Sequence, residues 1–405
     1  MSEMLPPSWS EMSQQIERGE RSQAWKKAGA WAVERLAQHL GERWPQDVWG
    51  KYSDLPGGMR FASSHTVAFV ELLELALRLE LVRDLPRFVS LRRALRTDAR
   101  GELVRHVRIQ LEVAALGLRH GHHVDFEPPI PSSSKRGDLA MDVGSEEPIL
   151  IETRALLIDN RTREINAFTD ELFWRIRLAV SPYGAECSGT VSKVLDDVAS
   201  AELLGEIETR ARLVAVGMHA SPVRAHGAEL IVSRAGERDG KGLTGPRIEG
   251  NGWPRVADRL KQKAEQTRGA RNVWLRFDVL DGLWQFTPWS QGDLATKAIQ
   301  LETVVFETLE PYRHVDGVAL SSGALLAQGE FVDEDQTSAQ GTAATRRVIP
   351  PLRVRETFVV PVVDSPAPGH IAAWRAFYEL EPSWLDWALA RFDLPRASEL
   401  FPTTE

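Results

Sequence analysis

Glu102 to Leu157 read ELVRHVRIQLEVAALGLRHGHHVDFEPPIPSSSKRGDLAMDVGSEEPILIETRALL, and the spacing of apolar residues changes partway along this segment. A helix is predicted over residues 99–120, because an apolar stripe with steps of four and three residues runs through Leu103, Val107, Leu111, Ala115 and Leu118. Gly121 ends that helix. Beyond it the spacing is that of β-strands, so the segment predicts one helix followed by three strands.

The three predicted strands cover residues 122–126, 138–143 and 149–157. A proline-rich loop separates the first two, and a turn at residues 144–145 joins the second to the third. The second strand alternates polar and apolar residues, whereas the third is almost continuously apolar, as is typical of a strand buried on both faces. A charged residue in such a strand needs a partner, because burying a bare carboxylate is costly.

The hairpin formed by the second and third strands is predicted to bring two carboxylates together. If the turn pairs Val143 with Ile149, Asp138 lies opposite Arg154, and Asp138 and Glu152 are diagonal neighbours about 7–8 Å apart at the backbone. A slip of one residue would send one set of side chains to the other face. In this register the carboxylates of Asp138 and Glu152 converge on one divalent ion. Carboxylates held this close repel each other unless a cation lies between them.

The order of these features resembles the PD-(D/E)XK nuclease superfamily, which has the restriction-endonuclease-like fold. That family has a helix with a glutamate, a strand with an aspartate, and a strand with acid-any-lysine. The matching positions here are Glu112, Gly137-Asp138 and Glu152-Thr153-Arg154. The resemblance covers residues 102–180 well and extends more loosely to Ser321. Glycine replaces the family's proline before Asp138, a common difference.

The resemblance implies a metal-dependent nuclease that hydrolyses phosphodiester bonds, with DNA expected ahead of RNA as the substrate. Glu112, Asp138 and Glu152 would then hold Mg²⁺ or Mn²⁺, and Asp138, Glu152 and Arg154 would be the catalytic residues. Mg²⁺ prefers oxygen ligands and keeps several waters. A bound ion activates one of those waters and stabilises the charge on a phosphate under attack.

Arg154 stands where the family has its lysine, and this departure is serious. A guanidinium stays protonated and cannot take a proton from water at neutral pH, but it can hold a phosphate through two hydrogen bonds. Another lysine could substitute, either Lys135 in the loop before Asp138 or Lys263 on a later predicted helix. The sequence leaves the choice between these two lysines open.

Two simpler interpretations stand beside the nuclease. Asp138, Glu152 and Arg154 could form a cross-strand ion pair on a solvated sheet face, and Glu112 could be a surface residue. Alternatively, the chain could keep the nuclease fold as a catalytically inactive scaffold that binds nucleic acid or a partner protein. The arginine at position 154 favours the scaffold.

A basic segment precedes the predicted site. Residues 83–108 hold eight arginines against Asp84, Asp98 and Glu102, within a chain of net charge −8. This segment could follow a phosphate backbone, or it could be a solvated helix face. The arginines are Arg83, Arg87, Arg92, Arg93, Arg96, Arg100, Arg105 and Arg108. The nucleic-acid contacts predicted from this patch and the nearby loop are Arg92, Arg93, Arg96 and Lys135.

The predicted fold class is α/β, with a mixed sheet flanked by helices. An all-helical region is expected at residues 1–98, the restriction-endonuclease-like core at 99–330, and a segment packing back on the core at 331–405. Within these regions, strands are predicted at residues 213–218, 228–233, 272–278 and 315–321, and a helix at 253–269. Residues 330–345 are predicted to be a loop, and a tryptophan-rich helix through Trp374, Trp384 and Trp387 is predicted near the C-terminus.

Composition narrows the function further. The chain of 405 residues is 43% apolar and 26% charged, which excludes a disordered or fibrous protein. A net charge of −8 excludes a protein that coats nucleic acid over its whole surface, so any such contact needs a local basic patch. The single cysteine, Cys187, indicates the reducing cytoplasm, and no apolar run reaches the roughly 18 residues of a membrane span. A homodimer or a partner bound through the N-terminal helices remains open.

Overall fold

The structure is a computed structural model of the chain. It describes residues 8–49, 66–97, 102–131, 134–144, 147–156, 160–219, 221–236, 242–246, 252–279, 293–325, 333–349, 353–362, 370 and 383–401. Arg100, Asp98 and Trp374, which were named above, lie outside these ranges, as do the side chains of Glu102, Leu103 and Arg105.

Among the described residues before position 98, the regular elements are helices. They are α1 (Trp9–Arg18), α2 (Gln23–Leu40), the π-helical η1 (Pro45–Trp49), α3 (Thr66–Val82) and α4 (Phe88–Thr97). Ser8 and Ser22 start the first two by accepting hydrogen bonds from backbone N–H groups of the first turn. The next helix, α5 (Glu102–Arg119), corresponds to the one predicted over residues 99–120.

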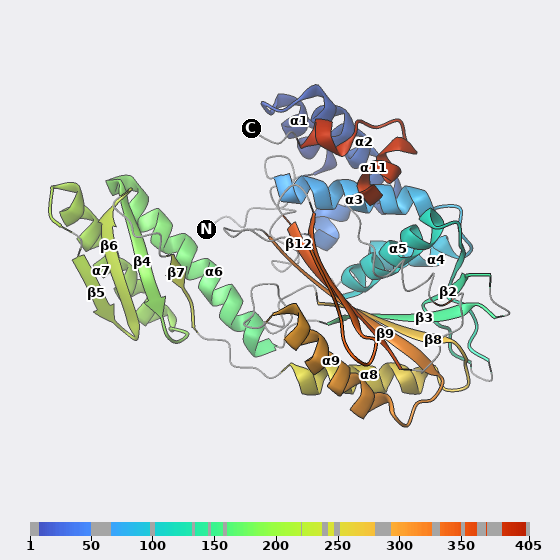
Figure 1. The fold of residues 1–405 in the computed structure, drawn as a ribbon. Coiled ribbons are helices and arrows are strands. Elements are labelled where there is room, and N and C mark those ends of the chain that lie inside the picture. Colours follow the sequence, from blue (N-terminus) through green and yellow to red (C-terminus); the bar gives the residue numbers. More distant parts are fainter. Residues whose placement is uncertain are drawn as a thin grey trace. The chain divides into compact units, whose positions relative to one another are not determined.

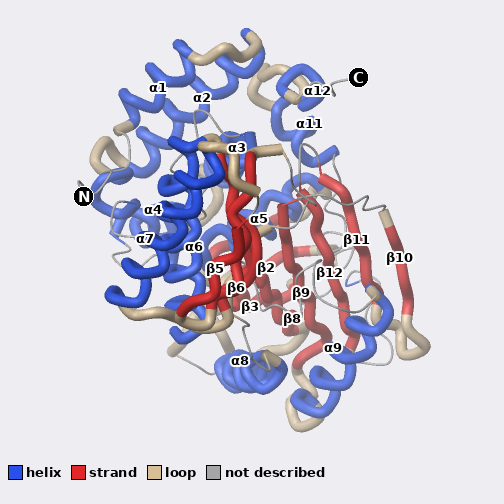
Figure 2. The backbone as a smooth tube through the Cα atoms, turned by 90° about the vertical axis from the view of Figure 1, so that its left-hand side faces the viewer, coloured by secondary structure: helices blue, strands red, loops and turns tan. Residues whose placement is uncertain are grey.

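Eight strands form one mixed sheet, so the coarse α/β prediction is confirmed. The strands are β1 (His123–Phe126), β2 (Leu139–Asp142), β3 (Ile149–Leu156), β8 (Val273–Val279), β9 (Val315–Leu325), β10 (Glu334–Thr337), β11 (Ala343–Ile349) and β12 (Arg353–Pro361). Their order is β1-β2-β3-β8-β9-β12-β11-β10, and Figure 2 shows the β9 to β10 side of this sheet. Strands β3, β8 and β9 run parallel, and the remaining pairs are antiparallel.

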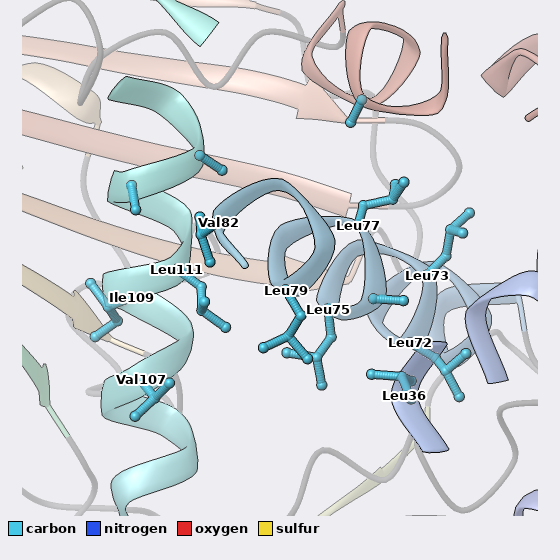
Figure 3. Packing of buried hydrophobic residues seen from close by; sticks show 14 of the residues in the cluster. Leu36, Leu72, Leu73, Leu75, Leu77, Leu79, Val82, Val107, Ile109 and Leu111 are labelled. Atoms are coloured by element: carbon cyan, nitrogen blue, oxygen red, sulfur yellow. The ribbon is translucent and has the colours of Figure 1, made fainter. Parts of the chain in front are cut away.

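Helices cover both faces of this sheet (Figure 1). Helices α3 and α5 lie on one side, and Figure 3 shows the leucine-rich faces through which α2, α3 and α5 pack together. On the other side lie α8 (Trp253–Gln266) and α9 (Leu294–Leu309), which bury a second apolar cluster against β8 and β9. All seven residues of β8 are buried, and its two charged residues, Arg276 and Asp278, are ion-paired within the sheet region. Two short C-terminal helices, α11 (Ser383–Ala390) and α12 (Ala397–Leu400), contact α3 and α2 respectively.

Residues Ile158–Asn251 form a separate compact unit, and Met1–Leu157 together with Gly252–Glu405 form the other. The smaller unit contains α6 (Asn160–Val180), the short η3 (Ser181–Tyr183) and α7 (Asp197–Ala215). Its strands β4 (Ala185–Val191), β5 (Ser221–Ala225), β6 (Ala228–Arg234) and β7 (Leu243–Thr244) form a sheet of order β5-β6-β4-β7 with its own apolar core. These limits differ from the predicted boundaries at residues 98 and 330. The first boundary is crossed by the packing of α3 against α5, and the second by the pairing of β9 with β12.

Two predicted elements are wrong. Residues 213–218 are not a strand, because the buried stripe of Leu203, Ile207 and Val214 continues α7 through Ala215. Residues 330–345 are not simply a loop, because β10 and the start of β11 fall within them. Arg346 of β11 links its two neighbouring strands, since it pairs with Glu334 of β10 and with Glu356 of β12. None of the described helices combines the length and apolar character needed to cross a bilayer.

Candidate functional site

Asp138 and Glu152 meet where β2 and β3 pair. The observed register pairs Met141 with Ile149 and Ala140 with Leu150, which is two residues away from the predicted register. A shift of two keeps every side chain on its predicted face. It also replaces the predicted diagonal relation of Asp138 and Glu152 with a direct one, and the backbone N–H of Asp138 donates to Oε1 of Glu152 at 3.2 Å.

Thr153 orients the Asp138 carboxylate. Its backbone N–H and its hydroxyl both donate to Oδ2 of Asp138, at 2.7 and 3.0 Å. Thr153 is fully buried, so these donors exchange little with water. The middle residue of the Glu-Thr-Arg tripeptide therefore holds the aspartate in a single orientation.

Gly137 allows β2 to approach β3 closely. A Cβ at this position would lie 2.5 Å from a methyl carbon of Leu150 and 3.2 Å from Oε1 of Glu152. The Gly137 N–H also donates to the carbonyl of Pro128 at 2.9 Å, and a proline could not make this bond. Glycine at position 137 thus has a local structural reason.

Lys263 of α8 supplies the cation of the site. Its Nζ lies 2.6 Å from Oε2 of Glu152 and 3.3 Å from Oδ2 of Asp138. It occupies a position in the buried stripe of α8, with Val256, Leu260 and Ala264. A lysine in an apolar stripe is unusual, and that signal was present in the sequence. Of the two lysines left open above, Lys263 contacts both carboxylates, whereas Lys135 is exposed.

His106 of α5 approaches the same aspartate. Its Nε2 lies 3.4 Å from Oδ1 of Asp138 and 3.2 Å from Nε2 of Gln110, one turn further along the helix. Its Nδ1 is 3.5 Å from the hydroxyl of Thr153. Sequence reasoning missed His106 and Gln110, although their spacing of four residues puts both on one helix face.

The pKa values of the two carboxylates are shifted in opposite directions. Burial and the neighbouring Asp138 raise the pKa of Glu152 to about 7, and the Lys263 ammonium only partly offsets them. Burial opposes ionisation of Asp138 as well, but the hydrogen bond from His106 and the charge of Lys263 outweigh it, so the pKa of Asp138 is low. Burial likewise favours neutral Lys263, but both carboxylates outweigh it and raise its pKa. The site thus has two acids and one permanent lysine cation.

Glu112 does not join Asp138 and Glu152, so the predicted metal triad is corrected. It lies six residues after His106, which is about 9 Å along the helix axis and about 120° around it. Its carboxylate instead pairs with Arg276 of β8 at 3.2 Å and with Arg355 of β12 at 2.8 Å. Burial opposes its ionisation, but these arginines and Arg78 outweigh burial and lower the pKa of Glu112 to about 2. Glu112 therefore connects α5 to the sheet.

The other predicted residues lie as follows. Arg154 is half-buried on β3 and, two residues beyond Glu152, shares its face of the strand. Arg96 donates to the backbone carbonyls of Gln38 and His39 at the end of α2, which gives it a structural partner. Arg93 is exposed and Arg92 is half-buried. Their contact with nucleic acid stays a prediction.

The residues of the site could hold a hard divalent cation. Within the described ranges, no group of three or more His, Cys, Asp or Glu side chains is arranged to hold a metal ion. Asp138 and Glu152 nevertheless offer two carboxylates, and Mg²⁺ is commonly bound through one or two carboxylates, with waters and substrate phosphates as the other ligands. The donor set therefore fits Mg²⁺ or Mn²⁺ and does not fit a four-ligand structural zinc site.

We compared the chain with protein-family models, with curated proteins and with solved structures. No family model, no curated protein and no solved structure matches the chain.

Proposed function

We propose that the larger unit has a restriction-endonuclease-like core and hydrolyses phosphodiester bonds of nucleic acid with Mg²⁺ or Mn²⁺. One observation carries this proposal. Asp138, which is partly buried just before β2, and Glu152, which is buried on β3, lie side by side and share one lysine from a different element. Burying charged groups costs stability, and active sites are where burial and adjacent like charges are arranged to shift pKa values. A solvated ion pair on a sheet face does not explain the burial of Glu152 and Lys263.

Each residue has a role in this proposal. Asp138 and Glu152 would hold the cation, and Thr153 orients Asp138 for it. When bound, the cation lowers the pKa of a water and neutralises charge on the phosphate. Lys263 brings to the site the ammonium that the family places in its acid-any-lysine tripeptide. Arg154, on the same face of β3 as Glu152, would hold a phosphate oxygen through its guanidinium.

The decisive experiment is incubation of the purified chain with plasmid, linear DNA and RNA, with and without Mn²⁺. We expect cleavage that requires the cation, with DNA cut faster than RNA. The Lys263→Met variant should lose this cleavage, while Lys261→Met, which changes an exposed lysine of the same helix, should keep it. Cleavage that persists at full rate with a metal chelator present would exclude the proposed function.

Metal binding should depend on pH through Glu152. Since the pKa of Glu152 is raised to about 7, a cation must displace its proton below that pH. We expect Mn²⁺ affinity to rise between about pH 5 and pH 7 and to level off above, with up to one proton released per ion at pH 6. Calorimetry in buffers of different ionisation enthalpy measures this release. The Glu152→Gln variant should show none, and equal release in both proteins would contradict the assignment.

A non-catalytic scaffold is the second candidate. It is favoured by Glu112, whose pairing with two arginines leaves only two carboxylates at the site. A scaffold should show no Mn²⁺ binding that Asp138→Asn abolishes. Nucleic-acid binding without cleavage and without such a metal site would establish the scaffold instead.

A further inference from the structure

The Lys263 ammonium occupies the space between the two carboxylates. Its Nζ contacts Oε2 of Glu152 at 2.6 Å and Oδ2 of Asp138 at 3.3 Å. Lys263 is 8% exposed and Glu152 is 3% exposed, so solvent screens their charges little. The ammonium thus serves as the counter-ion of an acidic pair whose members are the buried Glu152 and the partly buried Asp138.

A divalent ion would need the same oxygens. Mg²⁺ binds carboxylate oxygens at about 2.0–2.1 Å, so an ion shared by Asp138 and Glu152 would lie within a few ångströms of the present Nζ position. Two cations that close in a buried site repel strongly. Either the ammonium moves away from these oxygens or the ion does not bind them.

We propose that Lys263 is an internal competitor of the metal, which holds the acidic pair together without metal and leaves it when a divalent ion binds. This inference rests on the proposed function. Lysine suits such a role because its charge sits on a flexible four-carbon stem. Asp138 keeps other partners if the ammonium leaves, since the Thr153 backbone N–H donates to its Oδ2 and His106 contacts its Oδ1. A displaced ammonium stays beside the site, where a phosphate would pair with it.

A purely structural ion pair makes the opposite prediction. If Lys263 only organised the carboxylates for the metal, its removal would weaken metal binding. If it competes with the metal, its removal strengthens binding, even though cleavage is lost. Metal affinity and cleavage therefore change in opposite directions only under the proposal.

The test is a titration of the whole chain with Mn²⁺ alone at pH 8, where competition from protons is small. We expect Lys263→Met to bind Mn²⁺ at least about tenfold more tightly than the wild type. Lys261→Met, the exposed control on the same helix, should match the wild type. Equal or weaker binding by Lys263→Met would overturn the proposal.

A second variant and a second measurement guard against misfolding. Lys263→Gln keeps a hydrogen-bond donor without the charge, and it should also bind Mn²⁺ more tightly. Because ligand binding stabilises the folded state, Mn²⁺ should raise the Tm of either variant more than that of the wild type. A smaller rise in both would count against competition.

Asp138→Asn separates this inference from the proposed function. If that variant keeps the wild-type affinity for Mn²⁺, the proposed metal site is wrong. If it loses binding while Lys263→Met binds no more tightly than the wild type, only the competition is wrong.

Discussion

Asp138→Ala and Glu152→Ala are each expected to reduce cleavage by about a hundredfold to a thousandfold, while the chain stays folded. Each change removes one of the two carboxylates that would hold the cation against the phosphate, and interactions of this kind contribute roughly 10²–10³ apiece. The fold should survive, because in either variant the Lys263 ammonium keeps the other carboxylate as its partner. Cleavage of a supercoiled plasmid with Mn²⁺, together with thermal unfolding, measures both parts.

Asp142→Ala is the matched control for this pair. Asp142 lies at the exposed end of the same strand, and its carboxylate accepts a hydrogen bond from Gly144 in the turn. This variant should cleave at the wild-type rate. Full cleavage by both site variants would show that Asp138 and Glu152 do not form the active site. An equal loss of cleavage in Asp142→Ala would show that the substitutions had disturbed the whole hairpin.

Glu112→Ala should have its largest effect on stability instead. The change leaves Arg276 and Arg355 with one shared carboxylate, Asp278, in a region where all three side chains are largely buried. Removing one partner of a buried ion pair costs about 3–5 kcal/mol, because the remaining charge is uncompensated. Chemical denaturation measures this loss. Cleavage per folded molecule and Mn²⁺ affinity should stay at wild-type levels, unlike in a metal-ligand variant.

The acid sensitivity of the protein provides an independent check on Glu112. A carboxyl whose pKa is lowered in the folded state stabilises the fold above its ordinary pKa, and this contribution is lost as the pH falls. For Glu112 the loss should occur as the pH falls from about 4.5 toward about 2. Glu112→Gln should therefore flatten the fall in stability over that range. An unchanged slope would contradict the ion-paired state of Glu112.

Local sequence patterns were sufficient for the central part of the fold. The helix followed by three strands between residues 99 and 157 was predicted from apolar spacing alone. The spacing of apolar residues differs between a helix and a strand, and it can be read from residues that are close in the chain. The proximity of Asp138 to Glu152 was also predicted, as a diagonal relation across the hairpin, since a hairpin joins residues close in the chain. Its register was wrong by two residues, a shift that preserves the faces and is therefore invisible to the alternation pattern.

The composition of the site depended on contacts between distant segments. Lys263 is 111 residues from Glu152 and 125 from Asp138, and a separate unit of the chain, Ile158–Asn251, lies between them in sequence. Sequence could name Lys263 as a candidate but could not choose it, because the choice depends on how α8 packs on the sheet. For the same reason, Glu112 looked like a metal ligand until Arg276 and Arg355 were placed beside it.

Short-range chemistry along the chain thus determined which elements form and which acids face each other across the hairpin. Tertiary packing alone decided which cation those acids meet and which acid is taken up by arginines. The physical reason is that a buried charge is stabilised by whichever opposite charge the fold brings within a few ångströms, and the distance along the chain does not limit that choice.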